Sequence, residues 1–200
     1  MRDEGEQSNT TVCEACGTAV PSYDLVSYGS IDRGYRELCT RCFNAEVASA
    51  LGLEHFEHVR LEPVVMTDCA GEQHEFHFQI RLLGDVMALE AFELKADAPG
   101  GYQFEILGEP DGEPLPLLGS LIERMRRSLS VRYLVRDEDG AHIAEQTVCG
   151  RIEWDASGAG RVPLLVIDGQ DVSWDEFGRM LMSFEGWQFR VAIRDRSEEA

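Results

Sequence analysis

The sequence predicts an α+β fold: a small N-terminal module with four cysteines, followed by an antiparallel-sheet domain with two or three helices. Three observations predict this class. Two C-x2-C pairs, Cys13 with Cys16 and Cys39 with Cys42, flank a segment with the pattern of a β-hairpin. Several later segments alternate apolar and polar residues, as half-buried strands do. Two others carry apolar residues at helical spacing.

The chain has room for a domain with a real core and a smaller module, since 44% of its 200 residues are apolar. Both of its ends are polar and acidic. We therefore expect a disordered acidic tail at 1–11, a four-cysteine module at 12–52, an α+β domain at 59–195 and a second tail at 196–200.

The cysteine module contains the signals of a hairpin followed by a helix. Residues 22–38 carry two strand-like runs around a turn, and a hairpin there would return Cys39 to the neighbourhood of Cys16. The helix that follows would end at Gly52. Cys39 would be its N-cap and Cys42 would lie in its first turn, where free N–H groups and the helix dipole stabilise thiolates.

Thiolate is the form in which cysteine binds zinc, and four thiolates complete a tetrahedral shell. We therefore expect one structural zinc ion per chain, with no open position for catalysis. Its ligands are expected to be Cys13, Cys16, Cys39 and Cys42. Disulfides and redox chemistry are the alternatives, although a redox C-x2-C motif should follow a strand in a βαβ pattern and need not occur twice.

The order of a C-x2-C pair followed by Gly17, a hairpin, and a helix that begins with the second pair resembles a treble-clef zinc finger. The resemblance covers residues 12–52 only and implies the zinc-ligand role for the same four cysteines. Treble clefs serve DNA-binding factors, ribosomal proteins, ubiquitin-system modules and interaction domains, so no single function is implied. Nucleic-acid-binding members usually carry basic residues on or after the helix, whereas this helix has Glu46 and is followed by Glu54 and Glu57.

The longer domain is rich in strand patterns. We expect strands at 74–82, 86–94, 101–107, 131–137, 147–154 and 162–168. In the first of them, the even-numbered residues from His74 to Leu82 would form the buried face. A helix at 115–130 carries one apolar stripe that includes Leu121 and Met125.

The C-terminal part predicts a helix and then a strand. Ser173 and Glu176 form an S-x-x-E capping box, and Gly186 would end the helix. The apolar face of this helix would consist of Trp174, Phe177, Leu181 and Phe184. The next segment, 187–195, alternates and is expected to form a strand that packs on the helix. Its apolar face would consist of Trp187, Phe189, Val191 and Ile193.

The formal net charge of −19 limits the classes of partner. A surface this acidic repels nucleic-acid phosphates and anionic lipid, and it favours protein partners, above all basic ones. No apolar run approaches ~18 residues, so we expect no membrane span. The N-terminus lacks the apolar segment of a signal peptide, and we therefore expect a cytoplasmic location, where thiols stay reduced.

Two groups of residues are candidates for contacting a partner. Arg124 and Arg127 lie on the polar face of the predicted helix, within a basic island from Arg124 to Arg136. The alternative is that these arginines neutralise neighbouring acids. Met180 and Met182 lie outside the apolar stripe of the C-terminal helix and are expected to be exposed.

A second metal site is conceivable at Cys69, His74 and His77. His74 and His77 would face opposite sides of one strand, and a chelating pair on a strand needs even spacing. We therefore expect these three to be ordinary strand residues.

Together these features predict a zinc-binding cytoplasmic protein of the binding, adaptor or regulatory type, with a structural four-cysteine zinc site and a protein-interaction α+β domain. One alternative is a nucleic-acid-associated regulator that uses the zinc module and the Arg124–Arg136 island. The other is an enzyme whose site within 59–195 has no recognisable motif. We expect a non-enzyme, since the sequence contains no G-x-x-x-x-G-K-[ST], G-x-G-x-x-G, H-E-x-x-H or G-x-S-x-G motif. The oligomeric state does not follow from the sequence.

Overall fold

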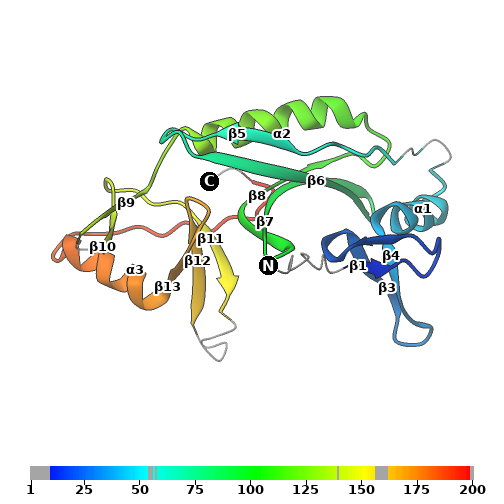
Figure 1. Cartoon of the computed structure of the whole chain (residues 1–200), viewed down its shortest axis with the longest axis horizontal. Helices are drawn as coiled ribbons and strands as arrows, with labels where there is room; N and C mark the ends of the chain where they lie inside the picture. The colour runs from blue at the N-terminus through cyan, green and yellow to red at the C-terminus, as the bar shows by residue number, and fades with distance from the viewer. Residues whose placement is uncertain (1–9, 54–55, 57, 139, 156–161, 199–200) are drawn as a thin grey trace, which may run out of the picture.

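The computed structural model describes residues 10–198 apart from 54–55, 57, 139 and 156–161. Its helices and antiparallel sheets form an α+β fold, as expected (Figure 1). Most of the expected N-terminal tail, residues 1–9, lies outside the described residues. Within the described part of the chain, no helix is both long and apolar enough to cross a membrane.

The N-terminal module consists of two hairpins and a helix. Its elements are β1 (Thr10–Val12), β2 (Ala19–Pro21), a 3-10 turn η1 (Ser22–Asp24), β3 (Leu25–Ser30), β4 (Gly34–Cys39) and α1 (Thr40–Leu51). β1 pairs with β2 and β3 with β4, both antiparallel. Cys39 is the N-cap of α1, and Gly52 ends the helix with a φ of 71° that glycine adopts without steric cost. The expected hairpin and helix are therefore confirmed.

The central unit is a sheet covered by one helix. Four antiparallel strands lie in the order β5 (Val64–Thr67), β6 (Gln73–Leu83), β7 (Val86–Lys95) and β8 (Ala98–Gly108), and α2 (Pro114–Leu129) packs against β7 and β8 (Figure 1). The alternation predicted for β6 is confirmed at His74, Phe76, Ile80 and Leu82, which are all buried, whereas Phe78 is half-buried. The face of α2 toward the sheet buries Leu121, Met125 and Leu129.

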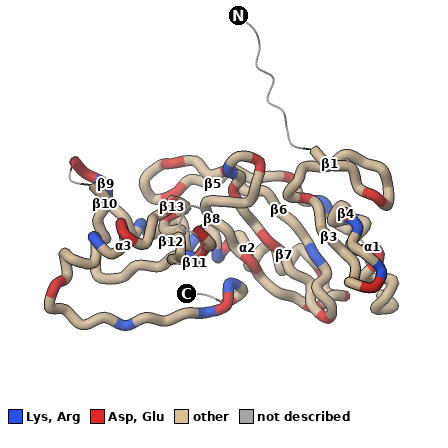
Figure 2. The backbone as a smooth tube through the Cα atoms, turned by 90° about the horizontal axis from the view of Figure 1, so that it is seen from below, with Lys and Arg blue, Asp and Glu red and all other residues tan. Residues whose placement is uncertain are grey.

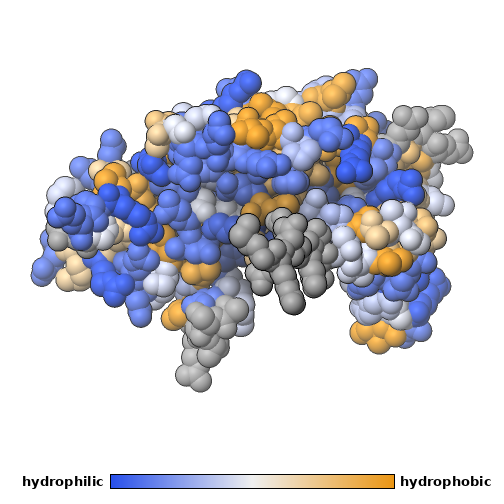
Figure 3. All heavy atoms as spheres, viewed as in Figure 1, coloured by the Kyte–Doolittle hydropathy of each residue, from blue (hydrophilic) through white to orange (hydrophobic). Residues whose placement is uncertain are grey.

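Some apolar surface remains over this unit. In the view of Figure 3 it gathers over β5 and α2. Val65 on β5 and Leu115 at the start of α2 are among the exposed apolar residues of these two elements.

The module and the central unit share one hydrophobic core. Leu38 and Phe43 of the module belong to the same buried cluster as Phe76 of β6. Polar contacts join them as well: the side chain of Gln79 on β6 donates to Thr40 Oγ1 at 2.6 Å. The four-cysteine module is therefore part of a larger folded body.

Asn44 of α1 makes the most specific of these contacts. Its fully buried side chain donates from Nδ2 to the Ile80 carbonyl at 2.7 Å and accepts at Oδ1 from the Leu82 N–H at 2.9 Å. β5 pairs with β6 only from Gln73 to Phe76, so the rest of that edge has no strand beside it in the described residues. Asn44 satisfies two backbone groups there as a neighbouring strand would.

The C-terminal unit has a separate and smaller core. Its elements are β9 (Leu134–Asp137), β10 (Gly140–Ile143), β11 (Arg151–Trp154), β12 (Pro163–Ile167), β13 (Gln170–Ser173), α3 (Trp174–Leu181) and the 3-10 turn η2 (Met182–Phe184). β9 and β10 form a hairpin, and β11, β12 and β13 form a three-stranded antiparallel sheet. The buried residues of this cluster are Leu134, Ile167, Val172 and Met180. The region expected as one domain, 59–195, thus contains two hydrophobic clusters.

The strand expected at 187–195 is not formed, and this prediction was wrong. The segment has no regular secondary structure, and we call it the connector. Its large apolar side chains are exposed, with Phe189 at 88%. Figures 1 and 2 show the connector running from α3 back toward the central unit as an extended chain. An alternating segment forms a strand only where it can reach the edge of a sheet. The C-terminal end of the connector is held at a different part of the protein.

The end of the connector is fixed by the residues that follow it, which we call the C-terminal anchor (residues 196–198). The guanidinium of Arg196 pairs with two buried carboxylates of the central sheet, Glu90 and Glu105. Arg124 of α2 donates to the carbonyls of Arg196 at 3.0 Å and Ser197 at 2.9 Å, and also to that of Glu198. The described part of the tail expected at 196–200 is therefore bound to the protein.

Candidate metal centre

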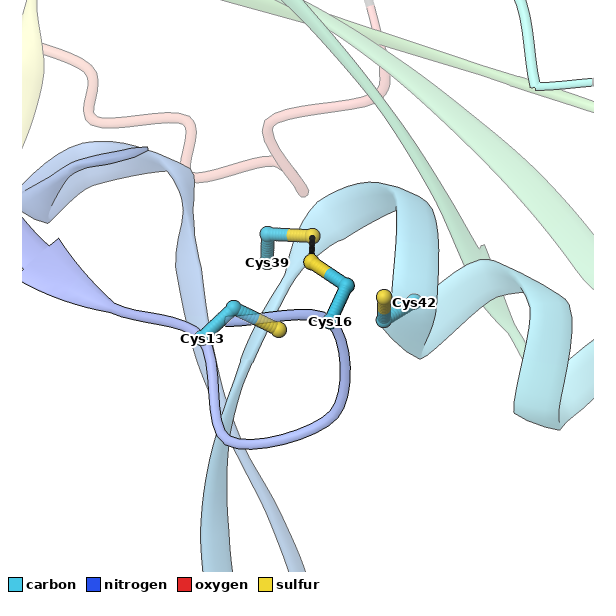
Figure 4. Close-up of side chains that lie close together, drawn as sticks. All are labelled: Cys13, Cys16, Cys39 and Cys42. Atoms are coloured by element: carbon cyan, nitrogen blue, oxygen red, sulfur yellow. Dashed lines mark hydrogen bonds between the residues drawn. The ribbon is translucent and has the colours of Figure 1, made fainter. Parts of the chain in front are cut away.

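Four cysteine side chains converge between the first hairpin and the start of α1 (Figure 4). The sulfur atoms of Cys13, Cys16, Cys39 and Cys42 all lie within 4.8 Å of one another. The Sγ atoms of Cys16 and Cys39 are 3.9 Å apart, and all four cysteines are free thiols. Sulfurs around a tetrahedral zinc ion with 2.3 Å bonds stand roughly 3.8 Å apart. The cluster therefore fits a metal ion of this size.

The first pair is positioned by a tight turn. The N–H of Gly17 donates to the Cys13 carbonyl, and the N–H of Cys13 donates to the Thr18 carbonyl, both at 2.9 Å. Gly17 has a φ of 70°, which explains why glycine follows the first C-x2-C pair. The turn brings both sulfurs of this pair into the cluster (Figure 4).

A short ladder brings this turn to the second pair. The N–H of Glu14 donates to the Glu37 carbonyl at 2.9 Å, and the Glu14 carboxylate accepts from the Glu37 N–H at 3.0 Å. Glu37 lies in β4 two residues before Cys39, so the ladder fixes the turn beside the start of α1. The hairpin of β3 and β4 thus achieves the return that its sequence predicted.

The thiols of the first pair are the more acidic ones. Burial acts to raise the pKa of Cys13, but backbone N–H groups, those of Cys39 and Cys16 first, outweigh it and lower the value. The hydroxyl of Thr18, 3.3 Å from the sulfur, and its backbone N–H lower the pKa of Cys16 to about 6. Hydrogen-bond donors stabilise thiolate at these two positions.

The second pair behaves differently from the sequence-based expectation. Burial raises the pKa of Cys39, and burial together with the neighbouring cysteine side chains raises the pKa of Cys42 to about 12. The helix start therefore does not by itself make these two cysteines thiolates. Because ionised sulfurs this close repel one another, a bound dication is what would allow all four to ionise.

The arginine candidates have intramolecular contacts. Arg124 forms the contacts to the C-terminal anchor described above and also donates to the Glu105 carbonyl at 2.8 Å. Arg127 lies 3.9 Å from Glu123 one helical turn earlier, an exposed ion pair of little energetic weight. The partner of Arg127 is thus an acidic side chain, whereas the contacts of Arg124 described here are with backbone carbonyls.

The methionine candidates differ from each other. Met182 is 64% exposed, as expected, whereas Met180 is buried in the C-terminal core. Trp174 and Leu181, expected to face the core, are instead about half exposed. Met180 is therefore unable to contact a partner in this structure. The predicted buried face of α3 was therefore wrong: the helix turns Met180 toward the core, and not Trp174 and Leu181.

The structure also separates the three residues considered for a second metal site. His77 packs against Tyr23 and Phe92, while His74 is buried on the other face of β6. Cys69 is exposed. His74 lies instead beside Asp68 and Glu72, two carboxylates that the sequence analysis did not connect with it.

Comparisons with known proteins divide the chain into three consecutive segments. Family models match residues 12–54 (DUF7685), 57–130 (DUF7686) and 133–198 (DUF7713), and each is described as a domain of unknown function. These segments correspond to the cysteine module, the central unit and the C-terminal unit with its connector and anchor. No curated protein and no solved structure matches the chain.

Proposed function

We propose that the four-cysteine module is a structural zinc site of the treble-clef type and that the chain is a non-enzymatic cytoplasmic binding protein. The observation that carries the zinc assignment is the convergence of four thiol sulfurs from two separate chain segments to within 4.8 Å. Thiolate sulfur is a preferred donor for zinc, and a set of four leaves no position for water. The role that follows is stabilisation of the fold.

Because the module and the central sheet share a core, zinc binding would stabilise more than the module itself. A module of about forty residues has little core of its own and gains much of its folding free energy from a bound metal. Here Cys13 and Cys39 are themselves buried members of the cluster that continues into β6 and β7. Zinc would therefore stabilise the edge of the central sheet as well as the module.

The proposed partner is another protein. The net charge of −19 disfavours nucleic acid, and the island suggested for such binding is engaged within the chain. Besides the contacts of Arg124, Arg132 lies 3.4 Å from Glu72, and Arg136 donates to Gln170 at 3.0 Å. The exposed aromatic and aliphatic side chains of the connector are of the kind that form protein interfaces.

Metal analysis and X-ray absorption test the zinc assignment. After dialysis against a weak chelator, the purified chain should retain about one zinc ion with four sulfur neighbours at roughly 2.3 Å. A folded chain without metal, or a zinc ion surrounded by nitrogen and oxygen, would contradict the proposal.

Quantitative affinity capture from the native cell tests the partner class. Proteins that are recovered with the wild-type chain should be depleted when the double variant Phe189→Ser and Ile193→Ser is used instead. Both side chains are exposed, so these substitutions should leave the fold intact. Arg190→Gln, at another exposed position of the connector, is the matched control. Retention of the wild-type chain on DNA or heparin at low salt would favour the nucleic-acid alternative instead.

A further inference from the structure

The turn between β5 and β6 holds one carboxylate in a fixed position. Asp68 Oδ1 accepts from the N–H of Ala70 at 2.9 Å and from the N–H of Glu72 at 2.8 Å. The backbone of Asp68 also donates to the Glu72 carbonyl at 2.9 Å. With Oδ1 used in this way, the second oxygen, Oδ2, is left directed at the neighbouring strand, where it lies 3.8 Å from the imidazole Nε2 of His74.

His74 is a buried polar residue with one unused nitrogen. The residue is only 7% exposed, and its Nε2 has no hydrogen-bond partner among the described residues. The 3.8 Å to Asp68 Oδ2 is too long for a hydrogen bond. A buried nitrogen left without a partner is costly, which calls for an explanation.

The other nitrogen of His74 is held by a carboxylate. Nδ1 lies 2.8 Å from Glu93 Oε1 on β7, and the second oxygen of Glu93 accepts from the Tyr102 N–H at 2.6 Å. With the proton on Nδ1 and donated to Glu93, the lone pair of Nε2 points toward Asp68. Histidines that bind metals are usually oriented by such a carboxylate.

We propose that Asp68, Glu72 and His74 form a second metal site, distinct from the four cysteines, that binds a divalent first-row cation such as zinc. One ligand atom from each residue lies within 4.8 Å of the other two. Ligands with bonds of about 2.1 Å around one tetrahedral ion stand roughly 3.4 Å apart. The 3.8 Å between Asp68 Oδ2 and His74 Nε2 is close to this spacing, and the side chain of Glu72, which is 56% exposed, has room to move toward them.

The charges and donors around the site fit a cation. Asp68, Glu72 and Glu93 contribute three carboxylates, and the arginine in contact with them is Arg132, 3.4 Å from Glu72 Oε2. A divalent ion would compensate the excess negative charge. One imidazole nitrogen with carboxylate oxygens is a donor set typical of zinc and its neighbours, and three protein ligands leave a position for water or a ligand.

Zinc binding to the full-length chain tests this site. The zinc-loaded chain is equilibrated with free zinc that a chelator buffer holds in the submicromolar range, and bound metal is counted. We expect about two zinc ions for the wild type and about one for Asp68→Asn. In that variant Oδ1 keeps both backbone hydrogen bonds, which places an amide nitrogen where Oδ2 was. Glu72→Gln should weaken the second zinc by tenfold or more.

Glu75→Gln is the matched control, because Glu75 is an exposed carboxylate on the same strand that faces away from the site, and it should bind like the wild type. Cobalt substitution separates the two centres. Cobalt at the four cysteines gives intense sulfur-to-metal absorption, whereas cobalt at the second site adds only weak bands that Asp68→Asn abolishes. A wild type that saturates with only the sulfur-bound ion, or an Asp68→Asn chain that keeps two ions, would overturn the site and leave the four-cysteine assignment intact.

Discussion

The fraction of apolar side chains that is buried differs between two parts of the molecule, residues 10–129 and residues 131–198. The first part gathers them into one continuous cluster that runs from the cysteine module through the sheet to α2. The second part buries only a few around Val172 and Met180 and exposes many others, among them Trp154, Trp174 and the large apolar side chains of the connector. The described residues thus include a body with a full core and a unit with a small one.

This difference in core size indicates which contacts stabilise each part. The larger body is held by packing and, under our proposal, by zinc, so its parts should lose structure together. The C-terminal unit has little packing to rely on, and its connection to the body includes charged contacts such as those of Arg196. Substitutions in the two parts should therefore differ in both size and extent.

Removal of one zinc ligand should have the largest effect. We expect Cys39→Ser to lose the metal and about 4 kcal/mol or more of stability, because the remaining thiols no longer complete the shell. Hydrogen exchange should show lost protection in β6 as well as in the module, since they share a core. Cys69→Ser, at an exposed cysteine outside the cluster, is the control and should change neither metal content nor protection. Unchanged protection of β6 in Cys39→Ser would break the comparison.

The same substitution in the two parts should have very different costs. Phe76→Ala removes a fully buried ring from the large cluster and should cost about 3–5 kcal/mol in urea unfolding. Phe189→Ala removes an 88% exposed ring and should change stability by no more than about 0.5 kcal/mol. Similar costs for the two variants would mean that the connector packs against something in solution.

Loss of the C-terminal anchor should have a smaller, pH-dependent effect. Burial is the main cause that raises the pKa of Glu105, and Arg196 is the first of the opposing influences. A raised pKa means that the folded chain binds more protons than the unfolded chain, so stability falls as the pH rises through that interval. Arg196→Ala should therefore cost more at about pH 8 than at about pH 5, where Glu105 is closer to neutral.

The size of this effect is limited by solvent. The Arg196 side chain is 44% exposed, so we expect a loss of about 1–2 kcal/mol near neutral pH, below that of a fully buried pair. Urea unfolding at both pH values measures it, with Arg190→Ala on the connector as the control. A cost that does not increase with pH would show that Glu105 does not sense Arg196.

The smallest effect concerns the start of α3. Ser173 Oγ accepts from the Glu176 N–H at 3.2 Å, and Ser173→Ala should cost about 1 kcal/mol. Faster hydrogen exchange in α3, without a change in β6, would show that the two parts open independently. Ser183→Ala, at an exposed position in η2, should have no measurable effect.

Local patterns predicted the larger body well because its elements bury one face each. The alternation of β6, the stripe of α2 and the hairpin between the cysteine pairs are all set by nearby residues and appear as expected. The clustering of the four cysteines was likewise predictable from their spacing, because a hairpin between the two pairs brings the pairs close together.

The features that were missed depend on distant partners. The connector has the same alternation as β6, but it pairs with no strand among the described residues, and the residues that follow it are held at the central sheet by Arg124 and Arg196. The orientation of α3 depends on which face meets β10 and β12. The grouping of Asp68 and Glu72 with His74 depends on the turn between β5 and β6 and on Glu93 of the next strand. Spacing along one segment reveals none of these.

The contact between Asn44 and β6 has a consequence for solubility. Past Phe76, the outer edge of β6 is covered by α1 rather than by a strand, with Asn44 satisfying the backbone of Ile80 and Leu82. An uncovered strand edge readily pairs with the edge of another molecule. If zinc is lost and α1 detaches, we expect this edge to become a site of self-association, so that metal supply would decide whether the chain stays dispersed or aggregates.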